Sequence, residues 1–162
     1  MSWFNIYGLI IMAVIMIPNI IASLKFKDMY ENKYDNKAII MLEQIGRFSS
    51  FALMIINIPY LCLGYFVDFG ETLYILVNSV LCFLYCLCWA VFWNKSGIFR
   101  SLALSILPSV MFIFSGIITL NIPLIIASII FAFCHITISY KKHYTITKIP
   151  HTTTDKRLLY GD

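Results

Sequence analysis

Three residues in this chain have side chains that can carry ionic or acid–base chemistry within or beside apolar sequence. Glu43 and Arg47 stand four positions apart in "LEQIGRF", and His135 lies within an apolar run. On a helix, residues four apart lie one turn apart, and acid before base is the favourable order for an ion pair. Imidazole changes its charge between pH 5 and 8. The chemistry expected is therefore an ion pair at a membrane boundary and, at His135, either proton binding or a hydrogen-bonded packing contact.

Amide and hydroxyl groups form a second set of candidates, because they also stand inside apolar sequence. Its members are Asn19, Asn57, Asn78 and Ser105. An amide side chain in hydrocarbon without a hydrogen-bond partner costs roughly several kcal/mol. Each of these side chains should therefore face other parts of the protein. In "ALMIINIPYL", Pro59 has no amide hydrogen for the carbonyl of Ile55, which leaves that carbonyl as a partner for a neighbouring helix.

The elements that must position these residues are long apolar segments. The chain has 162 residues, of which 60% are hydrophobic and 12% charged, with a mean hydropathy of +0.84. Soluble domains carry roughly 25% charged residues. Five apolar runs occur, at residues 3–24, 47–66, 73–93, 102–120 and 122–140. Each is near the roughly 20 residues that a helix needs to cross a bilayer. The sequence predicts an all-α polytopic membrane protein, a bundle of five transmembrane helices.

The distribution of basic residues predicts the orientation of this bundle. With five spans and the first loop inside, all 12 Lys and Arg residues fall on one side. Cytoplasmic loops carry an excess of both residues, so we expect the amino end outside and the carboxyl end inside. The net charge of +4 then reflects topology, and no nucleic-acid partner is expected. The predicted location is the cytoplasmic membrane of a bacterium.

The expected domain covers residues 1–142, followed by a cytoplasmic tail over 143–162. That tail is polar, basic and interrupted by Pro150, which favours disorder. The loop "KFKDMYENKYDNK" is mixed in charge, and a short helix on the membrane surface is one reading of it.

Each predicted span has a face that gathers polar or small residues, and two interpretations follow. If these faces point inward, Asn19, Ser105 and His135 lie roughly 5–9 Å inside the cytoplasmic boundary. Glu43 and Arg47 then lie just beneath them and Asn57 lies near the middle of its span. One interpretation is a polar pocket that opens to the cytoplasm. The other is interhelical hydrogen bonding, worth about 0.6–2 kcal/mol for each contact.

Several kinds of chemistry lack their usual residues. No Asp or Glu lies within the five predicted runs, which disfavours proton-driven antiport because such transporters need a buried carboxylate. The hydrolase, protease and nucleotide-binding motifs are missing, so we expect no catalytic, cofactor-binding or metal-binding residues. The thiols in "CFLYCLC" suit a soft metal, but their spacing is not CxxC and they fit small buried apolar residues better.

Two stretches carry a resemblance. "LEQIGRFSSFALMIINIP" and "HITISYKKH", together with the excess of Ile, Lys, Asn, Tyr and Phe, are similar to small multi-pass membrane proteins of AT-rich bacteria that have no characterised activity. This resemblance implies a membrane location and does not assign an activity. The size is also similar to that of the tryptophan-rich sensory and translocator proteins, whose tryptophan- and proline-rich signatures this chain lacks.

Two functions are compatible with these observations. The first is a non-enzymatic accessory, regulatory or immunity-type component that acts through partners, as a homo-oligomer or within a larger membrane complex. The alternative is a small-molecule transporter or permease subunit with a cytoplasm-facing polar pocket. Apart from the lipid bilayer, no partner is specified by the sequence.

Overall fold

The fold consists of five long helices. The computed structural model describes residues 3–25, 36–93 and 98–148, and for residues 98 and 142–148 it describes the backbone alone. The helices are α1 (Ile6–Lys25), α3 (Lys37–Ile55), α4 (Gly70–Val91), α5 (Ile98–Ile118) and α6 (Ile122–Lys148). All five are long and apolar enough to cross a membrane. The predicted all-α architecture with five such helices is confirmed.

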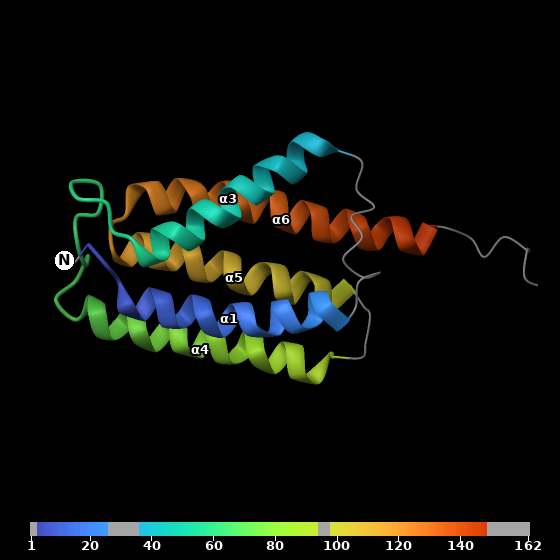
Figure 1. Cartoon of the computed structure of the whole chain (residues 1–162), viewed down its shortest axis with the longest axis horizontal. Helices are drawn as coiled ribbons and strands as arrows, with labels where there is room; N and C mark the ends of the chain where they lie inside the picture. The colour runs from blue at the N-terminus through green and yellow to red at the C-terminus, as the bar shows by residue number, and fades with distance from the viewer. Residues whose placement is uncertain (1–2, 26–35, 94–97, 149–162) are drawn as a thin grey trace, which may run out of the picture.

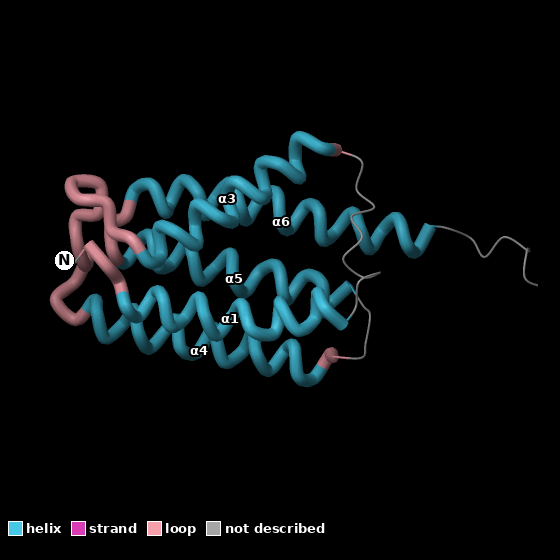
Figure 2. Tube along the Cα trace, in the orientation of Figure 1, coloured by secondary structure: helices cyan, strands magenta, loops and turns pink. Residues whose placement is uncertain are grey.

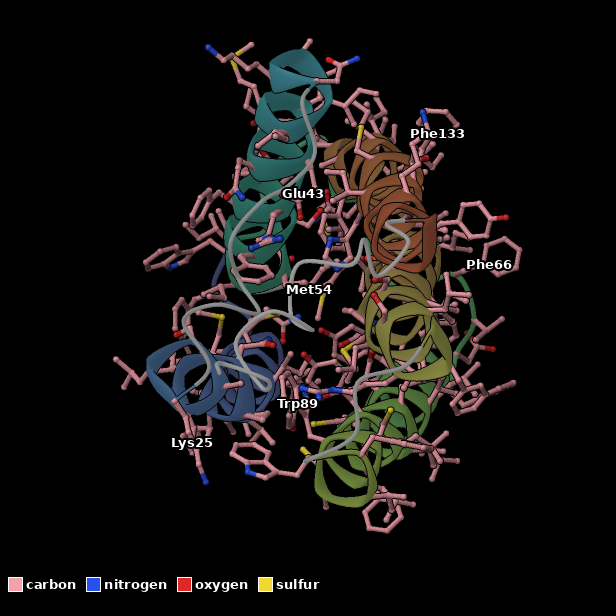
Figure 3. The ribbon with its side chains drawn as sticks, turned by 90° about the vertical axis from the view of Figure 1, so that its right-hand side faces the viewer. Lys25, Glu43, Met54, Phe66, Trp89 and Phe133 are labelled. Carbon is pink, nitrogen blue, oxygen red and sulfur yellow. The ribbon has the colours of Figure 1, made fainter. Side chains whose placement is uncertain are left out.

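The helices form a bundle in which successive helices run in opposite directions (Figure 1). Helix α4 packs between α1 and α5, and α6 packs between α5 and α3. Helix α3 also contacts α1, which closes the ring that Figure 3 shows in end view. The largest fully buried side chains include Tyr74, Phe112, Ile15 and Met54, so residues from four helices share the core.

The two ends of the bundle differ in chemistry. One end, here called the asparagine end, carries Asn5, Asn57 and Asn121 and most of the loop residues that Figure 2 draws in pink. The other, here called the basic end, carries Lys25, Lys37, Arg100 and Lys141, at or near helix termini. The alternation of helix directions therefore sorts the described Lys and Arg residues, Arg47 apart, toward one end.

Helices α1 and α3 touch closely at the asparagine end. The backbone N–H of Asn5 donates to the carbonyl of Ile55 at 2.8 Å. Gly8 faces the carbonyl of Met54 so closely that a Cβ atom would clash with it. Toward the basic end, α3 crosses α6 obliquely and moves away from α1 (Figure 1). Because glycine has no side chain, Gly8 allows α1 and α3 to meet at this point.

The second predicted span, 47–66, is the main difference between expectation and structure. Helix α3 begins at Lys37, where the side chain of Asn36 accepts from the N–H groups of Ala38 and Ile39, and it ends at Ile55. Ile56 is extended, and a loop follows as far as Phe69. The predicted span begins ten residues after the start of α3, because Glu43 and Arg47 lower the hydropathy of this helix. The asparagine and proline that follow favour a helix end rather than a helix interior.

The boundaries of the other four helices differ less from the predicted spans. The predicted spans 3–24, 73–93 and 102–120 overlap α1, α4 and α5 over most of their length. Helix α6 begins where the span 122–140 was expected, but its backbone stays helical through Lys148, into the segment predicted to be a disordered tail. The loop at residues 26–35 and the tail from 149 onward lie outside the described residues.

Candidate functional site

Glu43, Arg47 and His135 lie together between α3 and α6, and we call them the ionic cluster. The Arg47 guanidinium donates from Nη2 to Oε1 of Glu43, and Nδ1 of His135 lies 2.9 Å from the same oxygen. Glu43 is 2% exposed, whereas the side chains of Arg47 and His135 are 34% and 22% exposed. The cluster therefore has a buried carboxylate at its centre, with the guanidinium and the imidazole nearer the surface.

The local sequence accounts for this geometry. Glu43 and Arg47 are one helical turn apart, so both can reach the same side of α3. Gly46 lies between them, and a Cβ there would come within 2.9 Å of the backbone nitrogen of Phe131, so glycine permits the close approach of α6. The His135 ring stacks on Phe131, with ring centroids 4.7 Å apart and planes tilted by 20°. The stacked phenyl ring holds the imidazole in the plane that meets Glu43.

Glu43 and Arg47 lie within the candidate membrane span of α3, and His135 lies within that of α6. Counting from Lys37, Glu43 is about 9 Å along the helix and Arg47 about 15 Å. The prediction that no carboxylate lies inside a span is therefore wrong for Glu43. Its physical cause is the shift of the span from 47–66 to 37–55, which moves the charged pair inward. Figure 3 shows Glu43 pointing toward the bundle interior, whereas Lys25 and Phe133 point away.

The arrangement allows two kinds of chemistry. A carboxylate that accepts two charge-assisted hydrogen bonds is a strong interhelical contact. Carboxylate and imidazole are also side-chain groups that proteins use to bind protons. The same three side chains can therefore act as a clamp between α3 and α6 or as a proton-binding group.

Three of the four predicted amide and hydroxyl residues each pair with a different helix. Asn19 on α1 accepts at Oδ1 from the hydroxyl of Tyr85 on α4, at 2.8 Å. Asn78 on α4 donates to Ser115 Oγ on α5 at 3.1 Å, and Ser105 on α5 shares a hydrogen bond with Ser139 on α6. These contacts join α1 to α4, α4 to α5 and α5 to α6. They are the interhelical bonds that one of the two interpretations expected.

Asn57 does not lie at the middle of a span. It is in the loop after α3, 6% exposed, and its backbone N–H donates to the carbonyl of Trp3 at 2.8 Å. The Ile55 carbonyl does have a partner on another segment, the N–H of Asn5, but it lies at a helix end rather than in a proline-interrupted turn. Asn57 and His135 consequently do not line a common pocket.

Sequence reasoning missed two asparagines that organise the asparagine end. Asn5 accepts at Oδ1 from the N–H of Gly8 and donates to the hydroxyl of Tyr74, which links α1 to α4. Asn121 accepts from the N–H of Leu124 and donates to the carbonyl of Leu53. Both sit where N-cap residues stand, and an asparagine directly before an apolar run was the available signal.

Aromatic rings pair with cations at the basic end. The guanidinium of Arg100, 5% exposed, lies 4.8 Å from the ring centroid of Trp89 and donates to the carbonyl of Trp93. Lys25 Nζ lies 5.6 Å from the Trp93 ring. These contacts tie the end of α1, the end of α4 and the start of α5 together.

Neither of two hollows on the described surface is lined by Glu43, Arg47 or His135, although Gly46 lines the second. The first, here called the loop hollow, has a volume of about 240 Å³ at the asparagine end and is lined by Trp3, Asn57, Ile58, Pro59, Tyr60, Cys62 and Leu63. The second, here called the α3–α6 groove, has a volume of about 520 Å³, and its lining runs along α3 and α6 with Leu61 at the loop. Among the described residues, no three His, Cys, Asp or Glu side chains gather as a metal site requires.

Electrostatics at the loop hollow reflect burial and nearby acids. Burial raises the pKa of the Cys62 thiol, whose Sγ donates to the carbonyl of Thr119. Burial, and then the negative charge of Glu71, raises the pKa of Tyr65 to about 12. Glu71 is therefore within electrostatic reach of the loop that forms the hollow.

No protein-family model, curated protein or solved structure matches this chain.

Proposed function

We propose that this chain is a multi-pass membrane protein of the bacterial cytoplasmic membrane, with its amino end outside and its carboxyl end inside. Large apolar side chains cover its outer surface, among them Phe48, Phe83 and Phe133, which are 64%, 66% and 71% exposed. A patch of this extent is unfavourable in water and ordinary in lipid. The basic end meets the cytoplasm in this orientation, in keeping with the excess of Lys and Arg in cytoplasmic loops.

Within the membrane, the protein acts as a non-enzymatic accessory or regulatory component through contacts with a partner. The observation that carries this proposal is that the interior polar side chains are used between helices: Asn19 with Tyr85, Asn78 with Ser115, and Glu43 with His135. Groups satisfied in this way stabilise one bundle geometry and have little capacity left for a substrate. Recognition then falls to the outer surface and the ends.

Photo-crosslinking in living cells tests this proposal. A photoreactive residue is placed at one exposed position on each helix, namely Ile17, Phe48, Phe83, Ile106 and Phe133. We expect a discrete heteromeric adduct from one helix or two neighbouring helices, because a partner covers one side of the ring. Adducts from none of the five positions, or only homodimers from all of them, would contradict an accessory role.

A second candidate, a transporter subunit, is favoured by the position of Glu43. A buried carboxylate within a candidate span is a typical feature of proton-coupled transporters. Seven residues further along the same face of α3, Ser50 is fully buried, and its Oγ has no hydrogen-bond partner among the described residues. A carboxylate can bind a proton, and the Ser50 hydroxyl has hydrogen-bonding capacity available for a substrate.

Proton movement distinguishes the two candidates. Proteoliposomes containing the purified chain and an internal pH-sensitive dye are given a pH step with the membrane potential clamped. The accessory role predicts the acidification rate of empty liposomes for the natural chain and for Glu43→Gln alike. A faster rate that Glu43→Gln abolishes, while the variant still folds, would establish the transporter instead.

A further inference from the structure

The loop between α3 and α4 separates two hollows of opposite character. Tyr60, Cys62 and Leu63 line the loop hollow, while Leu61 between them lines the α3–α6 groove. The carbonyl of Leu61 accepts from the N–H of Ile122, which holds this loop against the start of α6. One short segment thus forms the boundary of a polar recess on one side and of an apolar groove on the other.

The groove suits a hydrocarbon chain. Its lining consists of Leu42, Ile45, Gly46, Ser49, Leu53, Leu61, Ile122, Pro123, Ile126, Ala127 and Ile130, without a charged or amide side chain. Its volume of about 520 Å³ lies within the roughly 300–1,000 Å³ of small-molecule sites. Along α6 the lining ends at Ile130, so the groove occupies the half of that helix nearer the asparagine end.

A transmembrane helix fits this groove less well than a lipid chain does. Helices in lipid associate through small residues or interhelical hydrogen bonds, because lipid tails are as apolar as leucine. Gly46 is already used against Phe131, and branched side chains form most of the remaining lining. For the same reason, an acyl chain gains little in the groove over bulk lipid. Selective binding must therefore come from the headgroup.

The asparagine end offers contacts for the ammonium group of a zwitterionic lipid headgroup. The rings of Trp3 and Tyr60, 68% and 95% exposed, line the loop hollow, and aromatic rings attract ammonium groups. The described charged side chains at this end are Asp68 and Glu71, both acidic and exposed. Tyr60 also has a backbone φ of +68°, which is uncommon for a bulky residue and is found where surrounding structure imposes it.

We propose that one phospholipid with an ammonium headgroup binds here, its headgroup at the loop hollow and one acyl chain in the α3–α6 groove. This site rests on the proposed membrane insertion, and the lipid belongs to the leaflet at the asparagine end. The lining of the loop hollow contains no Lys or Arg, and the described charges at this end are the acids Asp68 and Glu71, which disfavours an anionic headgroup.

Native mass spectrometry of the full chain in detergent tests the site with two probes, phosphatidylethanolamine and the anionic phosphatidylglycerol. We expect one phosphatidylethanolamine to be retained with a preference of roughly tenfold or more over phosphatidylglycerol. Equal retention of the two lipids, or preference for the anionic one, overturns the proposal. Extraction of the chain from membranes by carbonate would instead contradict membrane insertion itself, so the two failures are distinguishable.

A matched pair of substitutions locates the binding. Ile126→Trp fills the groove from a position 57% exposed, and Ile129→Trp adds the same bulk to the same helix at 55% exposure outside the groove lining. Ile126→Trp should reduce retention about tenfold and Ile129→Trp should leave it unchanged. Tyr60→Ala, which removes a solvent-exposed ring, should reduce the headgroup preference. Equal effects of the two tryptophans, or an unchanged preference in Tyr60→Ala, contradict the proposal.

Discussion

At the scale of single residues, Glu43 is an acidic side chain buried inside the described bundle. Its carboxylate is 2% exposed and contacts Arg47 within its own helix and His135 on α6. The spacing of Glu43 and Arg47 was enough to predict their ion pair. The contact with His135 was not predictable, because it depends on how α3 is placed against α6 and on the glycine that lets them approach.

Substitution of Glu43 should destabilise the protein. Glu43→Gln keeps the shape but removes the charge, and it leaves Arg47 and His135 without an ionised acceptor. Loss of one partner from a buried ion pair typically costs 3–5 kcal/mol, and the partial exposure of Arg47 reduces our expectation to about 2–3 kcal/mol. Thermal unfolding in detergent measures this change.

The control for this prediction is Glu71→Gln, at an exposed position on α4. It should change stability by no more than about 0.5 kcal/mol. The double variant Glu43→Leu/Arg47→Leu should recover part of the loss, because it removes both charges and leaves neither one unpaired. Equal unfolding temperatures for Glu43→Gln and Glu71→Gln would show that the ionic cluster does not stabilise the bundle.

At the scale of helices, hydropathy located four of the five correctly and misplaced one. Helices α1, α4 and α5 contain few charges, so their apolar runs and their helices nearly coincide, and α6 begins where its run begins but continues to Lys148. Helix α3 contains an acid and a base, and the loop after it is apolar enough to resemble a span. The asparagine and proline of that loop carried the correct signal, since both favour turns over helix interiors.

The α4–α5 contact provides a test of interhelical hydrogen bonding. Asn78, fully buried, donates to Ser115 and to the carbonyl of Tyr74. In a double-mutant cycle, Asn78→Leu and Ser115→Ala should be coupled by about 0.6–1.7 kcal/mol, the range for such pairs in membranes. Ser79→Ala, at the neighbouring exposed position, is the control. A coupling energy near zero would mean that the two side chains act independently.

At the scale of the whole molecule, the alternating helices bring the described loops of α3–α4 and α5–α6 to the asparagine end. Leu63, Gly64 and Phe66 donate backbone hydrogen bonds to the carbonyls of Leu120, Thr119 and Ile118. Segments about 55 residues apart in the chain are therefore joined there. This end is the region expected outside the cell.

Cysteine labelling tests the orientation of the whole chain. Tyr60→Cys places a thiol at a position that is 95% exposed, so a membrane-impermeant maleimide added to intact cells should label it rapidly. Native Cys62 should react more slowly at neutral pH, because burial raises its pKa and leaves less thiolate, and its rate should increase with pH.

A cysteine at Lys37, which is exposed at the basic end, should be labelled only after the cells are permeabilised. Labelling of this position in intact cells, with Tyr60→Cys protected, would reverse the proposed orientation.

The sequence by itself predicted five long apolar helices and the asymmetry of charge, because long apolar runs and the positions of Lys and Arg are properties of consecutive residues. Tertiary structure alone decided which polar groups meet. Asn19, Asn78, Ser105 and His135 were all foreseen as inward-facing, yet each joins a different partner helix. A helix presents several faces of similar polarity, so its rotation and neighbours follow from close packing at residues such as Gly8 and Gly46 rather than from periodicity.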